Sequence, residues 1–154
     1  MPDVMPIGLG NLMTDVKISD SVFLSSQTVE WATEQAFFNQ VDREFHFTVD
    51  VAATPENAKC ARFYTIEDDG LMQDWGGETV WCNPPYGDRI KDWMYKAATS
   101  DATTVLLVPA RTDVRWFHDI VLPRAEVRFI KGRLRFGGSK DPAPFPTMLV
   151  VFRP

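Results

Sequence analysis

The chain has 154 residues, a length that suits one domain and leaves little room for a second. Apolar residues make up 45% and charged residues 24%, the balance of a folded globular domain and not of a disordered chain. The formal net charge of -5 argues against a uniformly basic nucleic-acid-binding protein, and no apolar run approaches the roughly 18 residues that a membrane span needs.

The N-terminal stretch carries no clear hydrophobic period. We therefore interpret residues 1–27 as a flexible or loosely docked arm in front of a domain over residues 28–154. Met1–Asp15 has no basic region ahead of an apolar segment, so it does not have the form of a signal peptide. We expect a cytoplasmic protein.

The first predicted helix begins near Thr33, which is expected to be its N-cap, and Phe37 and Val41 share one face. Residues 46–50 (HFTVD) then have the pattern of a strand that ends in an acid. A second strand is expected over residues 62–65, and a third over residues 79–82 (TVWC).

A second helix is expected after an Asp88 cap. Its apolar residues follow the i, i+3, i+4, i+7, i+8 spacing of a helix with one buried face: Ile90, Trp93, Met94, Ala97 and Ala98. Residues 104–108 (TVLLV) form a continuous apolar run, which is typical of a strand buried on both faces, as in a parallel sheet.

The last third of the chain contains one predicted helix over residues 113–122. The strands expected after it cover residues 126–130, 133–136 and 148–152. Strands that alternate with helices, followed by a strand-rich end, predict an α/β fold with a mostly parallel sheet and antiparallel C-terminal strands.

Two polar residues follow predicted strands directly, Asp50 and Asn83. In open α/β sheets a ligand binds beyond the carboxyl ends of the strands, so these residues are expected to converge on one site. No metal site is predicted, because the two histidines are isolated and Cys60 and Cys82 have no metal-ligand spacing. We expect both cysteines to be reduced thiols.

The segment Asn83-Pro84-Pro85-Tyr86 (NPPY) is the most informative stretch. The two prolines stiffen the turn and lack N–H groups, so the Asn83 side-chain oxygen and the Pro84 carbonyl are two acceptors on one rigid corner. Two acceptors suit the two hydrogens of a planar exocyclic amine and pull its nitrogen toward tetrahedral geometry. Tyr86 offers a flat face on which a base can stack, worth about 1–3 kcal/mol.

The NPPY segment resembles the catalytic motif of amino-group methyltransferases that use S-adenosylmethionine. More specifically, a series of segments in order resembles the phage DNA N-6-adenine methyltransferase family over about residues 28–153: DVAATPENAKC (50–60), EDDGL (67–71), VWCNPPYG (80–87), VPARTDVRWFHD (108–119), FIKGRLRFG (129–137) and APFPTMLVVF (143–152). The resemblance implies a compact Rossmann-like methyltransferase fold. It also implies methyl transfer from S-adenosylmethionine to the N6 amine of adenine in DNA.

The same resemblance implies roles for individual residues. Asn83 and Pro84 hold the target amine, Pro85 belongs to the same catalytic segment, Tyr86 stacks on the adenine, and no metal is needed. The expected cofactor-binding residues are Thr33, Asp50, Ala52, Ala53, Asp68, Asp69 and Asn83. The pattern departs from the general methyltransferase one because no glycine-rich loop follows Asp50, and because Glu34 stands where the usual motif has proline after Thr33. An adenine inside a duplex cannot reach such a pocket, so base flipping or a single-stranded substrate is expected.

The net charge conceals two unlike halves. Residues 1–100 hold 7 basic and 16 acidic residues, a charge of -9, whereas residues 101–154 hold 9 and 5, a charge of +4. The expected DNA contacts lie in the basic half: Arg111, Arg115, Trp116, Lys131, Arg133 and Arg135. A chain of this length has no room for a large recognition domain, so short or relaxed sequence specificity is expected. Two alternatives stay open: a methyltransferase that acts on another planar amine, in RNA or a protein glutamine, and a non-catalytic DNA-binding module on the same fold.

Overall fold

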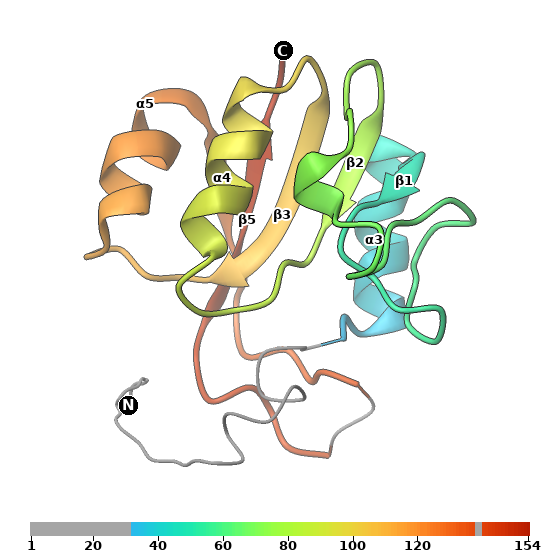
Figure 1. Ribbon diagram of the computed structural model, residues 1–154. Helices are drawn as coiled ribbons and strands as arrows, with labels where there is room; N and C mark the ends of the chain where they lie inside the picture. The colour runs from blue at the N-terminus through green and yellow to red at the C-terminus, as the bar shows by residue number, and fades with distance from the viewer. Residues whose placement is uncertain (1–31, 138–139) are drawn as a thin grey trace.

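A single mixed sheet organises the part of the chain that the computed structural model describes, residues 32–137 and 140–154. The strands lie in the order β1-β2-β3-β5-β4 (Figure 1). Their bounds are Val49–Asp50 for β1, Thr79–Cys82 for β2, Thr103–Pro109 for β3, Glu126–Phe129 for β4 and Thr147–Phe152 for β5. The predicted arm, residues 1–27, lies outside the described residues.

The sheet is parallel on one side and antiparallel on the other. β1, β2 and β3 run parallel, whereas β5 runs antiparallel to both β3 and β4. The fold class predicted from the sequence is therefore confirmed: the fold is mixed α/β and compatible with a Rossmann-like methyltransferase fold.

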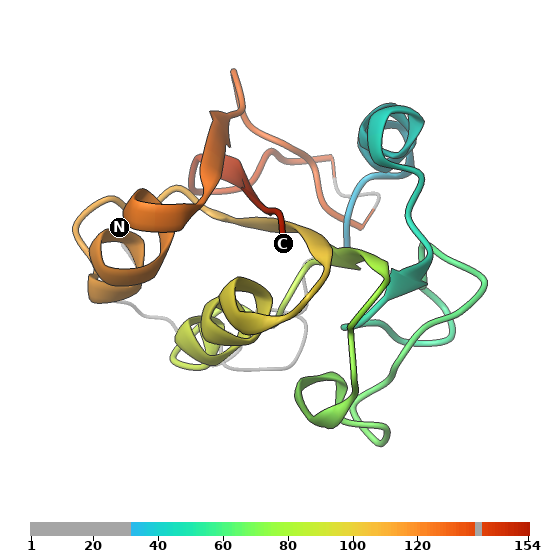
Figure 2. The same ribbon diagram turned by 90° about the horizontal axis from the view of Figure 1, so that it is seen from above.

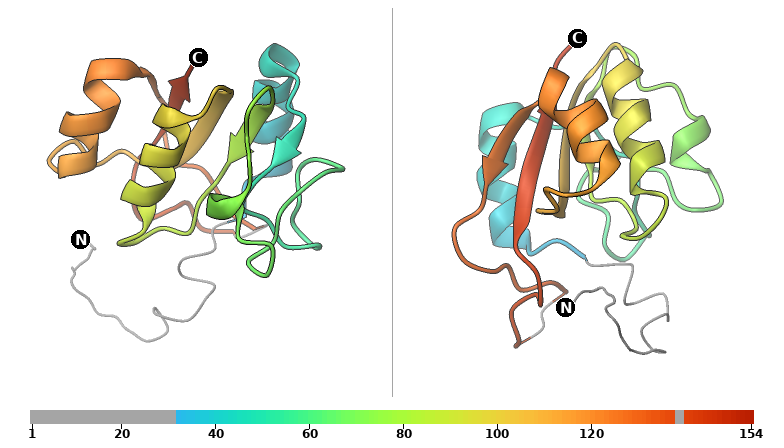
Figure 3. Two further views of the ribbon diagram at one scale, coloured as in Figure 1. Left: turned by 45° about the horizontal axis from the view of Figure 1, so that its top comes forward. Right: turned by 90° about the vertical axis from the view of Figure 1, so that its left-hand side faces the viewer.

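Helical elements cover both faces of the sheet (Figure 2). α3 (Gln35–Phe45) packs on one face, and α4 (Ile90–Thr99), η2 (Phe117–Val121) and α5 (Leu122–Arg124) lie on the other, where the short η1 (Gly70–Met72) also sits. Figure 3 shows the sheet between α3 and α4 from the side. No helix of the described residues is long and apolar enough to cross a membrane.

The side chains of β3 supply both cores. Leu106 and Val108 belong to the cluster under α4 and η2, whereas Val105 and Leu107 belong to the cluster under α3. This alternation follows from the two-residue period of a strand, and it confirms that the apolar run 104–108 is buried on both faces. The predicted buried face of α4 is also confirmed, except that Ala98 is only half-buried.

Both predicted helix caps are wrong. α3 begins at Gln35 with Glu34 as its N-cap, and no side chain caps it. α4 begins at Ile90 with Arg89, not Asp88, as its N-cap. Both helices therefore begin within two residues of the expected cap, and no side chain caps either of them. The helix predicted over residues 113–122 is present over residues 115–124, where a π-helical turn, η2, interrupts it and α5 ends it. Pro123 within α5 lacks the N–H that would donate an α-helical bond to the preceding turn.

Two predicted strands are also absent. In residues 62–65 only Phe63 forms a β-bridge, to Asp50. Residues 133–136 form no strand, although Leu134 and Phe136 are buried and Arg133 and Arg135, which alternate with them, are exposed, as the alternation predicts. The backbone of this segment bonds to other loops instead: Ala143 donates to the Leu134 carbonyl (2.7 Å), and Gly137 donates to the Ala32 carbonyl (2.8 Å).

Candidate active site at the carboxyl ends of β1 and β2

A pocket of about 450 Å³ lies beyond the carboxyl ends of β1 and β2. Its volume falls within the range usual for small-molecule sites. Residues from five parts of the chain line it: the segment before α3, β1 and the loop after it, the 65–71 turn, the end of β2 and the segment after it, and α4. Seven of the predicted site residues line this pocket: Thr33, Asp50, Ala52, Ala53, Asp69, Asn83 and Pro85. The predicted convergence of Asp50 and Asn83 is therefore confirmed.

The Asp50 side chain organises the loop that follows β1. One carboxylate oxygen accepts the backbone N–H of Ala52 (3.3 Å), and the other accepts that of Lys59 (2.9 Å). Burial raises the pKa of Asp50, and the two N–H donors oppose that rise. The loop between them therefore folds around this carboxylate and forms one wall of the pocket.

Asn83 leaves β2 and meets the segment before α3. Its side-chain amide nitrogen donates to the Thr33 hydroxyl oxygen at 3.0 Å. Thr33 is only 5% exposed. Thr33 therefore contacts the NPPY segment directly, in place of the helix-capping role that the sequence predicted for it.

Tyr86 is buried and does not line the pocket. Its hydroxyl donates to the Leu107 carbonyl at 3.2 Å, and its ring makes edge contacts with Phe136 and Phe145. Pro84 is likewise buried and outside the lining, whereas Pro85 lines it. The ring of Tyr86 is consequently held between β3 and the segment that connects β4 to β5.

The two acids of the 65–71 turn have different positions. The Asp68 carboxylate accepts from the backbone N–H (2.8 Å) and the hydroxyl (3.1 Å) of Thr65, which closes the turn, and it does not line the pocket. Asp69 lines the pocket and has a left-handed backbone, with φ of 58°. A Cβ on Gly70 would lie 2.0 Å from the Val51 carbonyl oxygen, so only glycine lets this turn approach β1 so closely.

Sequence reasoning missed several lining residues. Lys59 is half-buried, its amine donates to the Gln35 side chain (2.9 Å), and burial lowers its pKa despite the charge of Asp50. Trp93 was predicted only as a core residue of α4. No local pattern marks either residue, although Lys59 falls within the segment 50–60 that carries the family resemblance.

The predicted DNA contacts occupy two separate places, and none lines the pocket. Lys131, Arg133 and Arg135 are exposed on the segment between β4 and β5. In Figure 1 this segment lies at the same end of the sheet as the carboxyl ends of β2 and β3. Arg111 and Arg115 are exposed near the start of the η2 helix, where Trp116 is half-buried and packs against the core.

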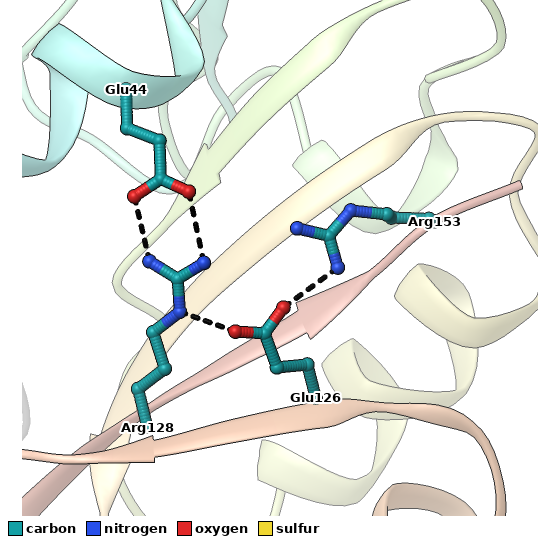
Figure 4. Close-up of polar contacts among 4 residues, drawn as sticks. All are labelled: Glu44, Glu126, Arg128 and Arg153. Atoms are coloured by element: carbon teal, nitrogen blue, oxygen red, sulfur yellow. Dashed lines mark hydrogen bonds and ion pairs between the residues drawn. The ribbon is translucent and has the colours of Figure 1, made fainter.

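Arg128 lies outside this exposed basic group. Its guanidinium donates two bonds to the Glu44 carboxylate (2.7 and 2.9 Å) and a third to Glu126, which also pairs with Arg153 at 2.8 Å (Figure 4). These carboxylates raise the pKa of Arg128, and Arg128 lowers the pKa of Glu44. Arg128 therefore joins α3 to β4.

Potential metal ligands do not cluster in the described residues: no group of three or more His, Cys, Asp or Glu side chains is placed to hold an ion. Cys60 and Cys82 are both free thiols, and burial raises the pKa of Cys60 to about 12. A thiol with so high a pKa is a poor nucleophile near neutral pH.

A mixed α/β sheet with a pocket at its parallel strand ends is compatible with the fold of the methyltransferase class. The family model of DNA N-6-adenine-methyltransferase (Dam) matches residues 20–154, and the chain belongs to this family.

Two phage proteins illustrate the similarity. The chain is 30% identical over 135 residues to the DNA N-6-adenine-methyltransferase of Haemophilus phage HP1 (strain HP1c1). This match covers 80% of this chain and 78% of that protein. It is 29% identical over 109 residues to the DNA N-6-adenine-methyltransferase of Escherichia phage T1. This second match covers 68% of this chain but only 45% of that protein.

Proposed function

We propose that this protein transfers a methyl group from S-adenosylmethionine to the N6 amine of adenine in DNA. We further propose that the target base is turned out of the stack and that sequence specificity is short or relaxed. The observation that carries the proposal is the position of Asn83: it directly follows β2 and lines the same pocket as the loop that Asp50 organises. Family membership supplies the reaction class.

The residues of the pocket fit S-adenosylmethionine, which supplies a methyl group activated by a sulfonium. Asp69 and Glu67 line the pocket with carboxylates suited to hydroxyl and ammonium groups, and Lys59 supplies a cation suited to a carboxylate. Ala52 and Ala53 also line the pocket, and their small side chains let a ligand come close to the backbone. Ile66 and Leu71 add the apolar surface that a purine requires, and Ile66 is 83% exposed.

The chemistry that we assign to the NPPY segment is the positioning of one amine. The Asn83 side chain and the Pro84 carbonyl accept its two hydrogens, which turns the nitrogen lone pair toward the methyl group. The N–C bond would form as the methyl–sulfur bond breaks to leave a thioether, and the surplus amine proton would pass to water. The rigid Pro84-Pro85 backbone keeps both acceptors in place, and such positioning supplies several kcal/mol of the rate enhancement. We assign the stacking surface to Tyr86. A base that uses it must meet the small exposed part of the ring or displace Phe136 and Phe145.

We propose that the DNA backbone follows the segment between β4 and β5. Three observations favour this segment: it contacts Tyr86 through Phe136, it contacts the pocket wall through the Gly137–Ala32 bond, and its residues 131–135 expose three cations. Those cations are Lys131, Arg133 and Arg135. Phosphate contacts from such residues position a duplex and make its binding sensitive to salt.

The test is transfer of labelled methyl groups to unmodified DNA by the full chain. Asn83→Ala is expected to lower transfer by at least about 100-fold, because misplacing a reacting group costs that much. Asn39→Ala is the matched control, since Asn39 is an exposed asparagine of α3 that accepts a hydrogen bond from the Gln35 side chain (2.8 Å) and lies outside the pocket lining. Robust transfer by Asn83→Ala would refute the assigned role.

A substrate panel separates the alternatives. Methylation of RNA or protein with DNA untouched would replace the proposed substrate. DNA binding without cofactor binding in calorimetry would instead indicate a non-catalytic module. Sequencing of DNA methylated in a methylation-free host reports the specificity, and a single long motif would contradict relaxed recognition.

A further inference from the structure

The hydrogen bond between Thr33 and Asn83 joins two residues 50 positions apart at the wall of the pocket. The Asn83 side-chain amide nitrogen donates to the Thr33 hydroxyl oxygen at 3.0 Å, and both residues line the pocket. Burying a hydroxyl is unfavourable, because the hydroxyl loses its hydrogen bonds to water. The bond that Thr33 makes in their place is to the Asn83 side-chain amide, the group that we propose binds the target amine of adenine.

Thr33 is itself held firmly. On one side of it, the Ala32 carbonyl accepts from the Gly137 N–H at 2.8 Å. On the other side, the Glu34 carbonyl accepts from the Phe38 N–H at 3.0 Å, the first turn of α3. Gly137 has a φ of 59°, a conformation that glycine adopts without strain. The backbone around Thr33 is therefore fixed between α3 and the segment that follows β4.

An asparagine amide needs such a partner. The last torsion of its side chain is broad, so the backbone of the NPPY segment fixes the Cβ atom but not the plane of the amide. A hydrogen bond from the amide nitrogen to a fixed oxygen restricts that rotation and thereby sets the direction of the carbonyl oxygen as well.

We propose that Thr33 is a positioning residue for methyl transfer, which acts by holding the Asn83 amide plane in the orientation that accepts the target amine. This inference rests on the proposed function. A positioning role differs from a cofactor-contacting role in what it predicts for Thr33. The positioning role predicts that loss of the hydroxyl lowers the rate of methyl transfer and leaves the affinity for S-adenosylmethionine unchanged.

The test compares three variants of the full chain. Thr33→Val keeps the shape and removes the hydroxyl, whereas Thr33→Ser keeps the hydroxyl. Thr104→Val is the matched control, because Thr104 is a fully buried threonine of β3 whose hydroxyl has no hydrogen-bond partner among the described residues. For each variant the kcat, the KM for DNA, the thermal midpoint and the calorimetric Kd of S-adenosylmethionine are measured.

We expect Thr33→Val to lower kcat by about tenfold or more, with the Kd of S-adenosylmethionine and the KM for DNA within about threefold of native. Thr33→Ser is expected to restore most of the rate, and Thr104→Val to match the native protein. If Thr33→Val does not fold, Thr33→Ala replaces it under the same criteria, since alanine adds no atoms.

Three results would overturn the inference. They are a native kcat in Thr33→Val, a serine variant as slow as the valine variant, and a loss of cofactor affinity as large as the loss of rate. A native protein that binds the cofactor but methylates no DNA would refute the proposed function itself, and it is distinguishable because every variant would then be equally inactive.

Discussion

Replacing Tyr86 by phenylalanine separates the two parts of this side chain. The hydroxyl contacts the Leu107 carbonyl within the fold, whereas the proposed chemistry uses only the ring. Tyr86→Phe removes the hydroxyl and keeps the ring. We therefore expect a small loss of stability with methyl transfer retained.

The size of the loss follows from the geometry. At 3.2 Å the bond from Tyr86 to Leu107 is longer than the usual O–H···O distance. A net value of about 0.5–1 kcal/mol is appropriate for such a bond. For a chain of this size that corresponds to a fall of about 1–4 °C in Tm.

Tyr86→Ala provides the contrast. It removes the ring from its contacts with Phe136 and Phe145 as well, and truncation of a buried aromatic costs about 3–5 kcal/mol. Both the fold around the NPPY segment and the proposed stacking surface are lost, so transfer is expected to fall sharply.

The pH dependence supplies an independent check. Burial raises the pKa of Tyr86 well above its ordinary value, so the phenol stays protonated in the folded state where the unfolded chain has begun to ionise. The native protein should therefore lose stability as pH rises above about 10, and Tyr86→Phe should lose less.

The assay is urea unfolding at several pH values together with labelled methyl transfer. A folded Tyr86→Phe variant that loses transfer would refute the reasoning, because it would place the hydroxyl in the reaction. Equal alkaline losses of stability in the two proteins would refute the burial argument.

Two further predictions concern the pocket and the DNA. Gly70→Ala brings a Cβ to 2.0 Å from the Val51 carbonyl oxygen, so we expect a stability loss of about 1–3 kcal/mol and weaker binding of S-adenosylmethionine in calorimetry. Gly76→Ala, whose Cβ meets only the Asp74 side chain, should change both far less, and equal effects would contradict the packing argument. Replacing Lys131, Arg133 and Arg135 by alanine should weaken DNA binding and reduce the slope of log K against log salt by about 2–3. Arg124→Ala, at an exposed arginine of α5, is the control, and an unchanged slope in the triple variant would remove this segment from the DNA path.

The part of the site that sequence could predict is the part set by strand ends. Asp50 and Asn83 each follow a strand, and the carboxyl ends of parallel strands meet at one edge of the sheet. Asp68 was predicted beside Asp69, but its carboxylate turns back to Thr65 within the same turn. Which of two adjacent acids faces a ligand depends on local backbone angles that composition does not encode.

The mistakes in the fold share a different origin. Thr33 is a favourable N-cap by residue type, yet its hydroxyl pairs with a side chain 50 residues away. Arg128 belongs to the basic C-terminal part of the chain, yet it pairs with Glu44, 84 residues earlier. Local propensity competes in both places with a partner that only the tertiary structure brings near. The buried strand β3 was predictable because its run of apolar residues needs no distant partner to be recognised.

The position of β5 has a consequence for the order in which this domain assembles. β5 covers Thr147–Phe152 yet lies inside the sheet, between β3 and β4. Before β5 pairs, β3 has an unpaired apolar edge and β4 has no neighbouring strand. Completing the sheet therefore requires contacts between segments far apart in the chain. Such contacts form slowly, and the unpaired edge of β3 is prone to aggregation until they form. A chain that lacks this one strand should aggregate instead of forming a smaller version of the domain.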